Sequence, residues 1–193
     1  TSVFGVKDAY LNSDADFHTT VSKMADIPRD QAKTINLGLF YGMGKAKLQA
    51  ELGVSKDKAE ELFAIYHQRV PFVKTLMKSV SNRAQQRGQI RTLLGRLCRF
   101  HLWEPNRFGI NKALPFEQAV QEHGQGNIRR AYTYKALNKL IQGSAADMTK
   151  KSMLDLYKEG IIAHIQIHDE LDLSVESPEQ AKKVVEIMEN AVK

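Results

Sequence analysis

The chain has 193 residues, of which 42% are hydrophobic and 26% are charged, and its formal net charge is +6. This hydrophobic content is enough for a real core, and the length suits one domain or slightly more. No run of about 18 apolar residues occurs and no signal peptide is visible, so we expect a cytoplasmic protein with no membrane partner. The single cysteine, Cys98, excludes an intrachain disulfide and an all-cysteine metal site.

The positive charge is concentrated in one part of the chain. Residues 29–100 hold 14 Lys and Arg against 5 Asp and Glu, a balance of +9, whereas the remainder holds 14 against 17. Such segregation predicts a basic face for a polyanion and a more acidic region elsewhere. The alternative is a protein whose positive charges merely prevent association.

Residues 1–28 are polar and turn-rich, and we expect a short helix to begin near Asp16. His18 follows this start closely, and a helix N-terminus is a ready binding site for phosphate. An exposed surface histidine without a ligand is the alternative.

Residues 29–44, RDQAKTINLGLFYGMG, are predicted to open a helix directly after Pro28. In a helix, Arg29, Lys33, Leu37 and Tyr41 recur every four residues and form one slowly winding stripe. Two cations followed by an apolar residue and an aromatic ring suit a helix that lies beside a nucleotide, with phosphates at its start and a base at its end. A solvated helix with one apolar seam is the alternative.

The glycines after this helix do not form a phosphate-binding loop. The sequence from Gly42 to Lys45 lacks the full G-x4-G-K-[ST] pattern and a preceding strand, so it is read as the end of the helix. Further helices are predicted over about 46–52, from Ser55, and from Pro71 to Gly88, which makes 29–88 a mainly helical region with basic outer faces. In the last helix, Val73, Leu76, Met77 and Val80 should face inward, and Lys74, Lys78, Arg83 and Arg87 outward.

Residues 89–131 give weaker signals. Gln89–Leu94 is predicted as a strand that leads to Gly95 and Arg96, where the backbone can approach a ligand closely. Cys98 is expected to be a small buried apolar residue. Residues 100–131 are predicted as an irregular insertion to which the sequence assigns no function.

A long helix is predicted from Tyr132 to Lys158. Asn138 and Gln142 are one turn apart, so their amides should project together and can read the acceptors that every base pair presents in the minor groove. Ordinary surface amides on a helix are the alternative. Its apolar side is expected to comprise Leu137, Ile141, Ala145, Met148, Met153 and Leu156.

Apolar residues in the segment 160–175 stand at odd-numbered positions, as on the buried face of a half-buried strand. They are Ala163, Ile165, Ile167, Leu171, Leu173 and Val175. Asp169 also has an odd number, so a straight strand would place it on the same buried face and bury its charge at considerable cost. A hairpin at His168-Asp169-Glu170 avoids this and presents the acids at its tip, where they can hold Mg²⁺ through oxygen. A plain acidic turn is the alternative, and a zinc site is disfavoured because no further ligand pair has suitable spacing.

Several of these segments together resemble family A DNA polymerases. Arg29-x3-Lys33-x2-Asn36-x-Gly38 with Tyr41-Gly42 is similar to the finger helix of that family, and Asp16-Phe17-His18-Thr19 to its D-x-H-T element. Gly95-Arg96-x2-Arg99, then Gln142 to Asp147, then His168-Asp169-Glu170 follow in the family's order.

The resemblance implies an α+β fold with a palm-to-fingers connection over 1–28, helical fingers over 29–88, and part of an antiparallel palm sheet with an acidic hairpin over 89–193. It implies template-directed addition of deoxynucleotides to a primer 3′ end with two Mg²⁺ ions. The implied partners are primer–template DNA, deoxynucleoside triphosphates and the rest of a polymerase chain, including a missing palm strand and a thumb.

The same resemblance implies residue roles. Asp169 is expected to hold metal, with Glu170 as a possible second carboxylate, and Arg29, Lys33 and His18 to neutralise the triphosphate. Arg29 and Lys33 are thereby catalytic candidates together with Asp169, and Lys33 can also protonate the leaving pyrophosphate. Leu37 is expected against the nucleotide and Tyr41 beside the templating base. The residues expected to contact DNA are Tyr41, Gly42, Arg96, Asn138, Gln142 and His168.

Two departures from the family pattern matter. Position 37 is Leu, whereas Phe or Tyr stands there in the best-known relatives. Some phage polymerases have a similar residue at this position, which favours a role in phage replication. No D-x-S-x-x-E-like element with the family's other metal-binding aspartate precedes Asp16. We therefore expect a fragment that is inactive alone. The rival hypotheses are a non-catalytic nucleic-acid-binding module and a nucleotide-binding helical protein with no DNA partner.

Overall fold

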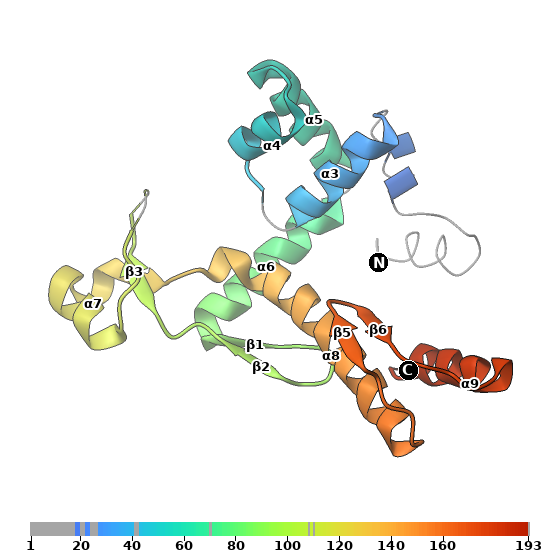
Figure 1. Cartoon of the computed structure of the whole chain (residues 1–193). Helices are drawn as coiled ribbons and strands as arrows, with labels where there is room; N and C mark the ends of the chain where they lie inside the picture. The colour runs from blue at the N-terminus through green and yellow to red at the C-terminus, as the bar shows by residue number, and fades with distance from the viewer. Residues whose placement is uncertain are drawn as a thin grey trace. The chain divides into compact units, whose positions relative to one another are not determined.

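The computed structural model describes residues 18–19, 22–23, 27–40, 43–69, 71–107, 109 and 111–192. Tyr41, Gly42 and the helix start expected near Asp16 lie outside these residues. The chain divides into two compact units, the first comprising Thr1–Gln89 with Arg99–Asn138 and the second Ile90–Cys98 with Lys139–Lys193. Helices predominate, and the strands of the described part form three two-stranded sheets (Figure 1), which confirms the predicted α+β class.

Within the first unit, the described residues between 29 and 88 form four helices, which confirms the helical character predicted for this region. They are α3 (Arg29–Phe40), α4 (Lys45–Leu52), α5 (Lys56–Arg69) and α6 (Pro71–Arg87). Glycines end two of them in the left-handed conformation, at Gly53 with φ 63° and at Gly88 with φ 67°. At the start of α5, the Ser55 hydroxyl accepts a hydrogen bond from the Lys58 backbone N–H at 3.2 Å.

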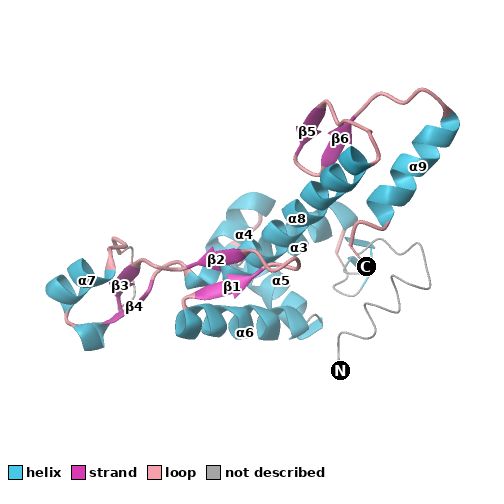
Figure 2. Ribbon diagram, turned by 90° about the horizontal axis from the view of Figure 1, so that it is seen from below, coloured by secondary structure: helices cyan, strands magenta, loops and turns pink. Residues whose placement is uncertain are grey.

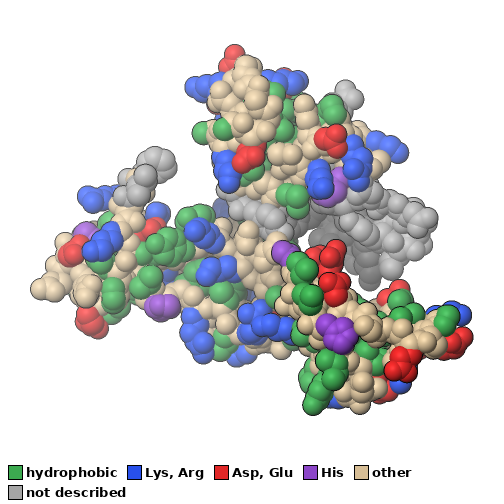
Figure 3. Space-filling model, viewed as in Figure 1, with side chains coloured by type: hydrophobic (Ala, Val, Ile, Leu, Met, Phe, Trp, Pro, Cys, Tyr) green, Lys and Arg blue, Asp and Glu red, His purple; other side chains and the backbone are tan. Residues whose placement is uncertain are grey.

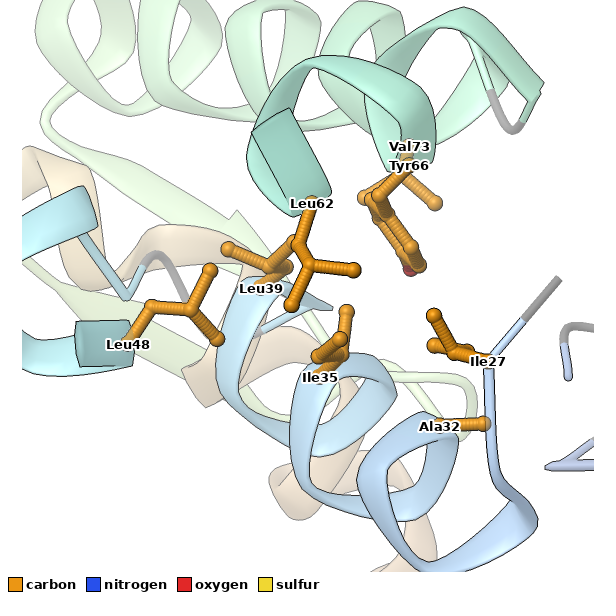
Figure 4. Close-up of a cluster of buried hydrophobic side chains, with 8 residues drawn as sticks. All are labelled: Ile27, Ala32, Ile35, Leu39, Leu48, Leu62, Tyr66 and Val73. Carbon is orange, nitrogen blue, oxygen red and sulfur yellow. The ribbon is translucent and has the colours of Figure 1, made fainter. Parts of the chain in front are cut away.

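One apolar cluster holds these helices together (Figure 4). Its buried members are Ile27, Ala32, Ile35, Leu39, Leu48, Leu62, Tyr66 and Val73. Burial of each large aliphatic side chain contributes about 1.5–3 kcal/mol to the free energy of unfolding. Val73 and Val80 of α6 are buried as predicted, but Leu76 is 39% exposed, so its predicted inward position is wrong. Residue 76 lies at the edge of the face that Val73 and Val80 define on α6.

The stretch 100–131 contains more regular structure than the sequence predicts. Strand β3 (Trp103–Pro105) pairs antiparallel with β4 (Ile128–Arg130), and α7 (Phe116–His123) lies between them in sequence. The centroids of the Trp103 and Phe116 rings are 5.1 Å apart, and the Arg130 guanidinium lies 4.5 Å from the centroid of the Trp103 ring. These contacts join residues far apart in sequence, so local patterns did not reveal them. Short 3-10 helices at Gln125–Asn127 and Thr133–Lys135 complete this part.

The second unit is built around α8 (Ala136–Lys158), whose residues from Lys139 onward belong to it. Its other elements are the hairpin of β1 (Gln89–Arg91) and β2 (Leu97–Arg99), the antiparallel hairpin of β5 (Ile165–Ile167) and β6 (Glu170–Asp172), and α9 (Pro178–Glu189). Figures 1 and 2 show β5 and β6 beside α8. A small core of Leu156, Ile161 and Val184 joins α8 to α9, with Leu171 and Leu173 packed against it.

Three predictions about this unit are wrong in detail. Ile165 and Ile167 are predicted on the buried face of a strand, but they are 54% and 56% exposed. None of the described residues forms a layer that covers this face of the two-stranded hairpin. Cys98 is half-buried and not buried. On α8, Ala145 and Met148 are exposed, so the apolar side of this helix is narrower than predicted. Within the described residues, no helix is long and apolar enough to cross a bilayer.

Candidate active site

Helix α3 presents the predicted stripe to solvent. Arg29, Lys33 and Leu37 are exposed, whereas Ile35 and Leu39 on the opposite side are buried in the core of the first unit. The helix is therefore fixed by its apolar face, and its two cations are held in place without being buried. Leu37 is 44% exposed and is therefore accessible to a ligand.

His18 lies against the same helix. The Asn36 side-chain amide nitrogen is 3.3 Å from His18 Nδ1, and Asn36 itself is only 2% exposed. The two side chains are within hydrogen-bonding distance, and the tautomer of His18 sets which of them donates. The buried Asn36 amide thus orients the ring, and only its place in the finger-helix motif distinguishes Asn36 in the sequence.

A hollow of about 580 Å³ adjoins the stripe within the first unit. Leu37, Gly38, Met43 and Asn138 line it, together with Thr34, Lys47 and Glu51. Two residues expected at a nucleotide and at DNA, Leu37 and Asn138, therefore border one hollow. A Cβ atom at position 38 would meet the flexible end of the Met43 side chain, so a larger residue there requires Met43 to move.

The second unit contains the acidic hairpin. Ile167 pairs with Glu170, so His168 and Asp169 form a two-residue tip, as predicted. His168 has φ 56°, a left-handed conformation that costs a non-glycine residue about 1–2 kcal/mol. The Gln166 side chain supports the tip by donating a hydrogen bond to the His168 carbonyl oxygen at 2.6 Å. Figure 3 shows acidic and histidine side chains gathered at this end of the hairpin. Backbone strain of the kind that His168 shows is frequent at functional sites.

The tip faces α8 across a hollow of about 210 Å³. Its lining residues include Gln142, His168 and Asp169, with Ala145, Ala146 and Thr149. Three of the predicted site residues, one on the helix and two on the hairpin, thus meet at one place in the second unit. The small side chains at 145 and 146 leave the space between them open.

Asp169 at the tip and Glu170 at the start of β6 suit one part of a magnesium site. Asp169 and Glu170 are exposed oxygen donors, and His168 Nδ1 lies 3.2 Å from Asp169 Oδ1. Mg²⁺ in proteins typically takes one or two carboxylates and completes its shell with phosphate and water oxygens. In the described residues no three His, Cys, Asp or Glu side chains cluster as a metal-binding group. The donors present therefore fit a shared site and not a self-contained one.

Arg96 makes contacts that sequence reasoning missed. Its Nε donates to Asp147 Oδ1 at 2.7 Å, and its Nη2 donates to the Gly143 carbonyl oxygen at 2.8 Å. The Leu93 N–H donates to the Ser144 hydroxyl at 3.0 Å, so the β1–β2 turn is fastened to α8 at several points. Arg96 remains 50% exposed, whereas Asp147 is 7% exposed. A buried acid in a helix requires a partner, but the burial of Asp147 is visible only in the structure, so the sequence does not predict this pair.

Asp147 is ionised in this arrangement. Burial raises the pKa of its carboxyl, but hydrogen bonds from Thr92 and Arg96 and the charges of Arg96 and Lys150 outweigh that effect. The pKa of Asp147 therefore lies below its usual value.

Comparisons with known proteins show the family to which the chain belongs. Residues 7–193 match the family model described as DNA polymerase family A. The chain belongs to that family. It is 32% identical, over 97% of its length, to a DNA-directed DNA polymerase of Pseudomonas phage M6, and 33% identical, over 91%, to DNA polymerase I of Bacillus caldotenax.

A solved family A structure supports the fold as well. It is described as the POL domain of Pol1 from M. smegmatis in complex with DNA primer-template and dNTP, and it matches 96% of the chain with a TM-score of 0.72 at 27% identity. The chain spans 33% of that structure, 30% of the phage relative and 19% of the Bacillus relative.

Proposed function

We propose that this chain is the fingers and part of the palm of a DNA-directed DNA polymerase that extends a primer by template-directed nucleotidyl transfer. The observation that carries the proposal is the meeting of Gln142, His168 and Asp169 around one hollow of the second unit. Membership of DNA polymerase family A and the exposed cations of α3 support it. The proposed substrates are primer–template DNA and deoxynucleoside triphosphates.

In this proposal, α3 binds the incoming nucleotide. Arg29 and Lys33, with His18 beside them, neutralise the triphosphate, since phosphoryl transfer depends on positioning and charge stabilisation. Lys33 can donate a proton to the leaving pyrophosphate. Leu37 packs against the sugar and base, and Tyr41 lies by the templating base.

The second unit binds the reacting end of the DNA. Asp169, with Glu170 as a possible helper, would hold Mg²⁺, which when bound lowers the pKa of the attacking hydroxyl and stabilises charge on the phosphate. Asn138 and Gln142 supply amides for the minor groove, and His168 and Arg96 contact the DNA strands. Gly42, which lies outside the described residues, is also proposed to contact the DNA. We infer that the remaining metal-binding carboxylate and the thumb come from other parts of the polymerase.

A DNA-replicating enzyme works where the DNA is, so we place this one in the cytoplasm, of the host cell if the polymerase is phage-encoded. The isolated chain should not extend a primer, because it lacks the second metal-binding aspartate.

The decisive test is primer extension by the full polymerase with Asp169→Asn. We expect extension to be lost, whereas Asp172→Asn, a matched change of an exposed acid on β6, should leave it intact. Equal activity of the Asp169→Asn enzyme and the unsubstituted enzyme would contradict the proposal. DNA binding that is salt-sensitive but accompanied by no nucleotide incorporation in any form of the protein would favour a non-catalytic binding module.

A further inference from the structure

The solvent face of α6 is unusually basic. The helix PFVKTLMKSVSNRAQQR has four cations and no acidic residue in 17 positions. Lys74, Lys78, Arg83 and Arg87 are all exposed, and none of them belongs to the site described above. The charge of this face is therefore not part of the proposed nucleotide-binding stripe on α3.

The polar side chains of this face form two parallel rows. Lys74, Lys78 and Asn82 follow each other at four-residue intervals and span about 12 Å along the helix. Thr75 and Ser79 form the second row, one residue further round. All five are exposed, and they border one shallow hollow. Each of them can donate a hydrogen bond, and none carries a negative charge.

The lysines of this face are not neutralised by the described part of the chain. Neither Lys74 nor Lys78 forms an ion pair there, whereas Lys58 lies 3.0 Å from Glu61 and Lys183 lies 2.7 Å from Glu159. The charge of Lys74 is also felt by its neighbour His67, because burial and then Lys74 lower the pKa of that imidazole. A row of unpaired cations flanked by hydroxyl and amide donors is suited to a chain of phosphates.

We propose that this face of α6, formed by Lys74, Thr75, Lys78, Ser79 and Asn82, binds the phosphodiester backbone of a single DNA strand. The two rows are adjacent on one helix face and can together follow one strand, and no aromatic side chain lies among the five to stack on bases, so binding should not depend on sequence. The inference goes beyond the proposed polymerase activity, because it needs neither metal nor nucleotide.

The test uses the 193-residue chain and a labelled oligothymidylate, with fluorescence anisotropy over a series of salt concentrations. Lys74→Gln with Lys78→Gln should weaken binding at least tenfold at low salt. Two lost phosphate contacts should also reduce the slope of log K against log salt concentration by about 1.4. Lys74→Arg with Lys78→Arg, which keeps the charge, should restore both quantities.

The matched control is Lys56→Gln with Lys182→Gln, which removes the same charge from exposed positions on α5 and α9. This pair should leave affinity and slope nearly unchanged. Equal weakening by both pairs would overturn the proposal in favour of general attraction to a cationic protein. Tighter binding of a duplex than of the single strand, with the same sensitivity to Lys74 and Lys78, would overturn the single-strand assignment. Circular dichroism of each variant checks that the helices are retained. If Lys74→Gln with Lys78→Gln loses helix, binding and its salt dependence are measured on the single variant Lys78→Gln instead.

Discussion

Arg96 and Asp147 are 51 residues apart in sequence, and in the structure the Arg96 Nε donates to the Asp147 Oδ1 at 2.7 Å. The pair joins the β1–β2 turn to the buried side of α8. Five residues earlier on the same helix, Gln142 lines the hollow that Asp169 also lines. The contact therefore supports the helix that presents Gln142 to the acidic hairpin.

The stability contributed by this pair should depend on pH. The pKa of Asp147 is depressed in the folded chain, so its contribution is present above the ordinary carboxyl pKa and is lost as the pH falls through the folded value. We expect Asp147→Asn to reduce the free energy of unfolding at pH 7 by about 2 kcal/mol and to have a smaller effect near pH 3. Urea unfolding at both pH values measures this. The exposed Asp172→Asn is the control, and an equal loss at both pH values would contradict the ionised state of Asp147.

Gly143 should be required where the β1–β2 turn packs on α8. A Cβ atom at this position would lie 2.8 Å from Thr92 Cγ2, so Gly143→Ala should destabilise the chain although alanine favours a helix by about 1 kcal/mol. Adding Thr92→Ser removes the methyl group and keeps the hydroxyl that accepts from the Arg96 N–H. Thermal unfolding should show a lower midpoint for the single variant and recovery in the double variant. A double variant no more stable than Gly143→Ala alone would show that another contact is responsible.

The helices and the acidic hairpin could be predicted because their signals are local. Pro71 begins α6 and Gly88 follows its last residue. A straight strand would place the charged Asp169 on its buried face, so a turn is predicted there, and the structure has one at that place. The exposure of Ile165 could not be predicted, because alternation shows which residues share a face but not whether another layer covers it. The Arg96–Asp147 pair and the β3–β4 pairing join distant residues and left no pattern that a short window could detect.

Position 37 should control discrimination between sugars in the full polymerase. Leu37 is exposed on the stripe of α3 and offers neither a ring nor a hydroxyl to a nucleotide. We expect Leu37→Tyr to raise the incorporation of dideoxynucleotides relative to deoxynucleotides, because the new hydroxyl can replace the hydrogen bond that the missing 3′-hydroxyl would make. Competition assays on one primer–template measure the ratio, and Leu37→Met is a control of similar volume. An incorporation ratio unchanged by Leu37→Tyr would refute this role.

Asn36 should influence nucleotide binding through His18. The Asn36 amide lies 3.3 Å from His18 Nδ1 and orients the ring. In the full polymerase, Asn36→Leu should raise the KM for nucleotides several-fold and leave kcat largely unchanged, because the change affects the orientation of a binding residue. Steady-state kinetics test this, with His18→Ala as the reference. A fall in kcat alone would contradict a role in nucleotide binding.

The central claim is that α3 and the acidic hairpin act on the same nucleotide. A structure of the full polymerase with primer–template DNA and a deoxynucleoside triphosphate tests it most directly. The account predicts that the Lys33 ammonium group contacts the triphosphate and that the Asp169 carboxylate lies at the same phosphates. Lys33 and Asp169 on opposite sides of the molecule, or a nucleotide bound away from both, would contradict it.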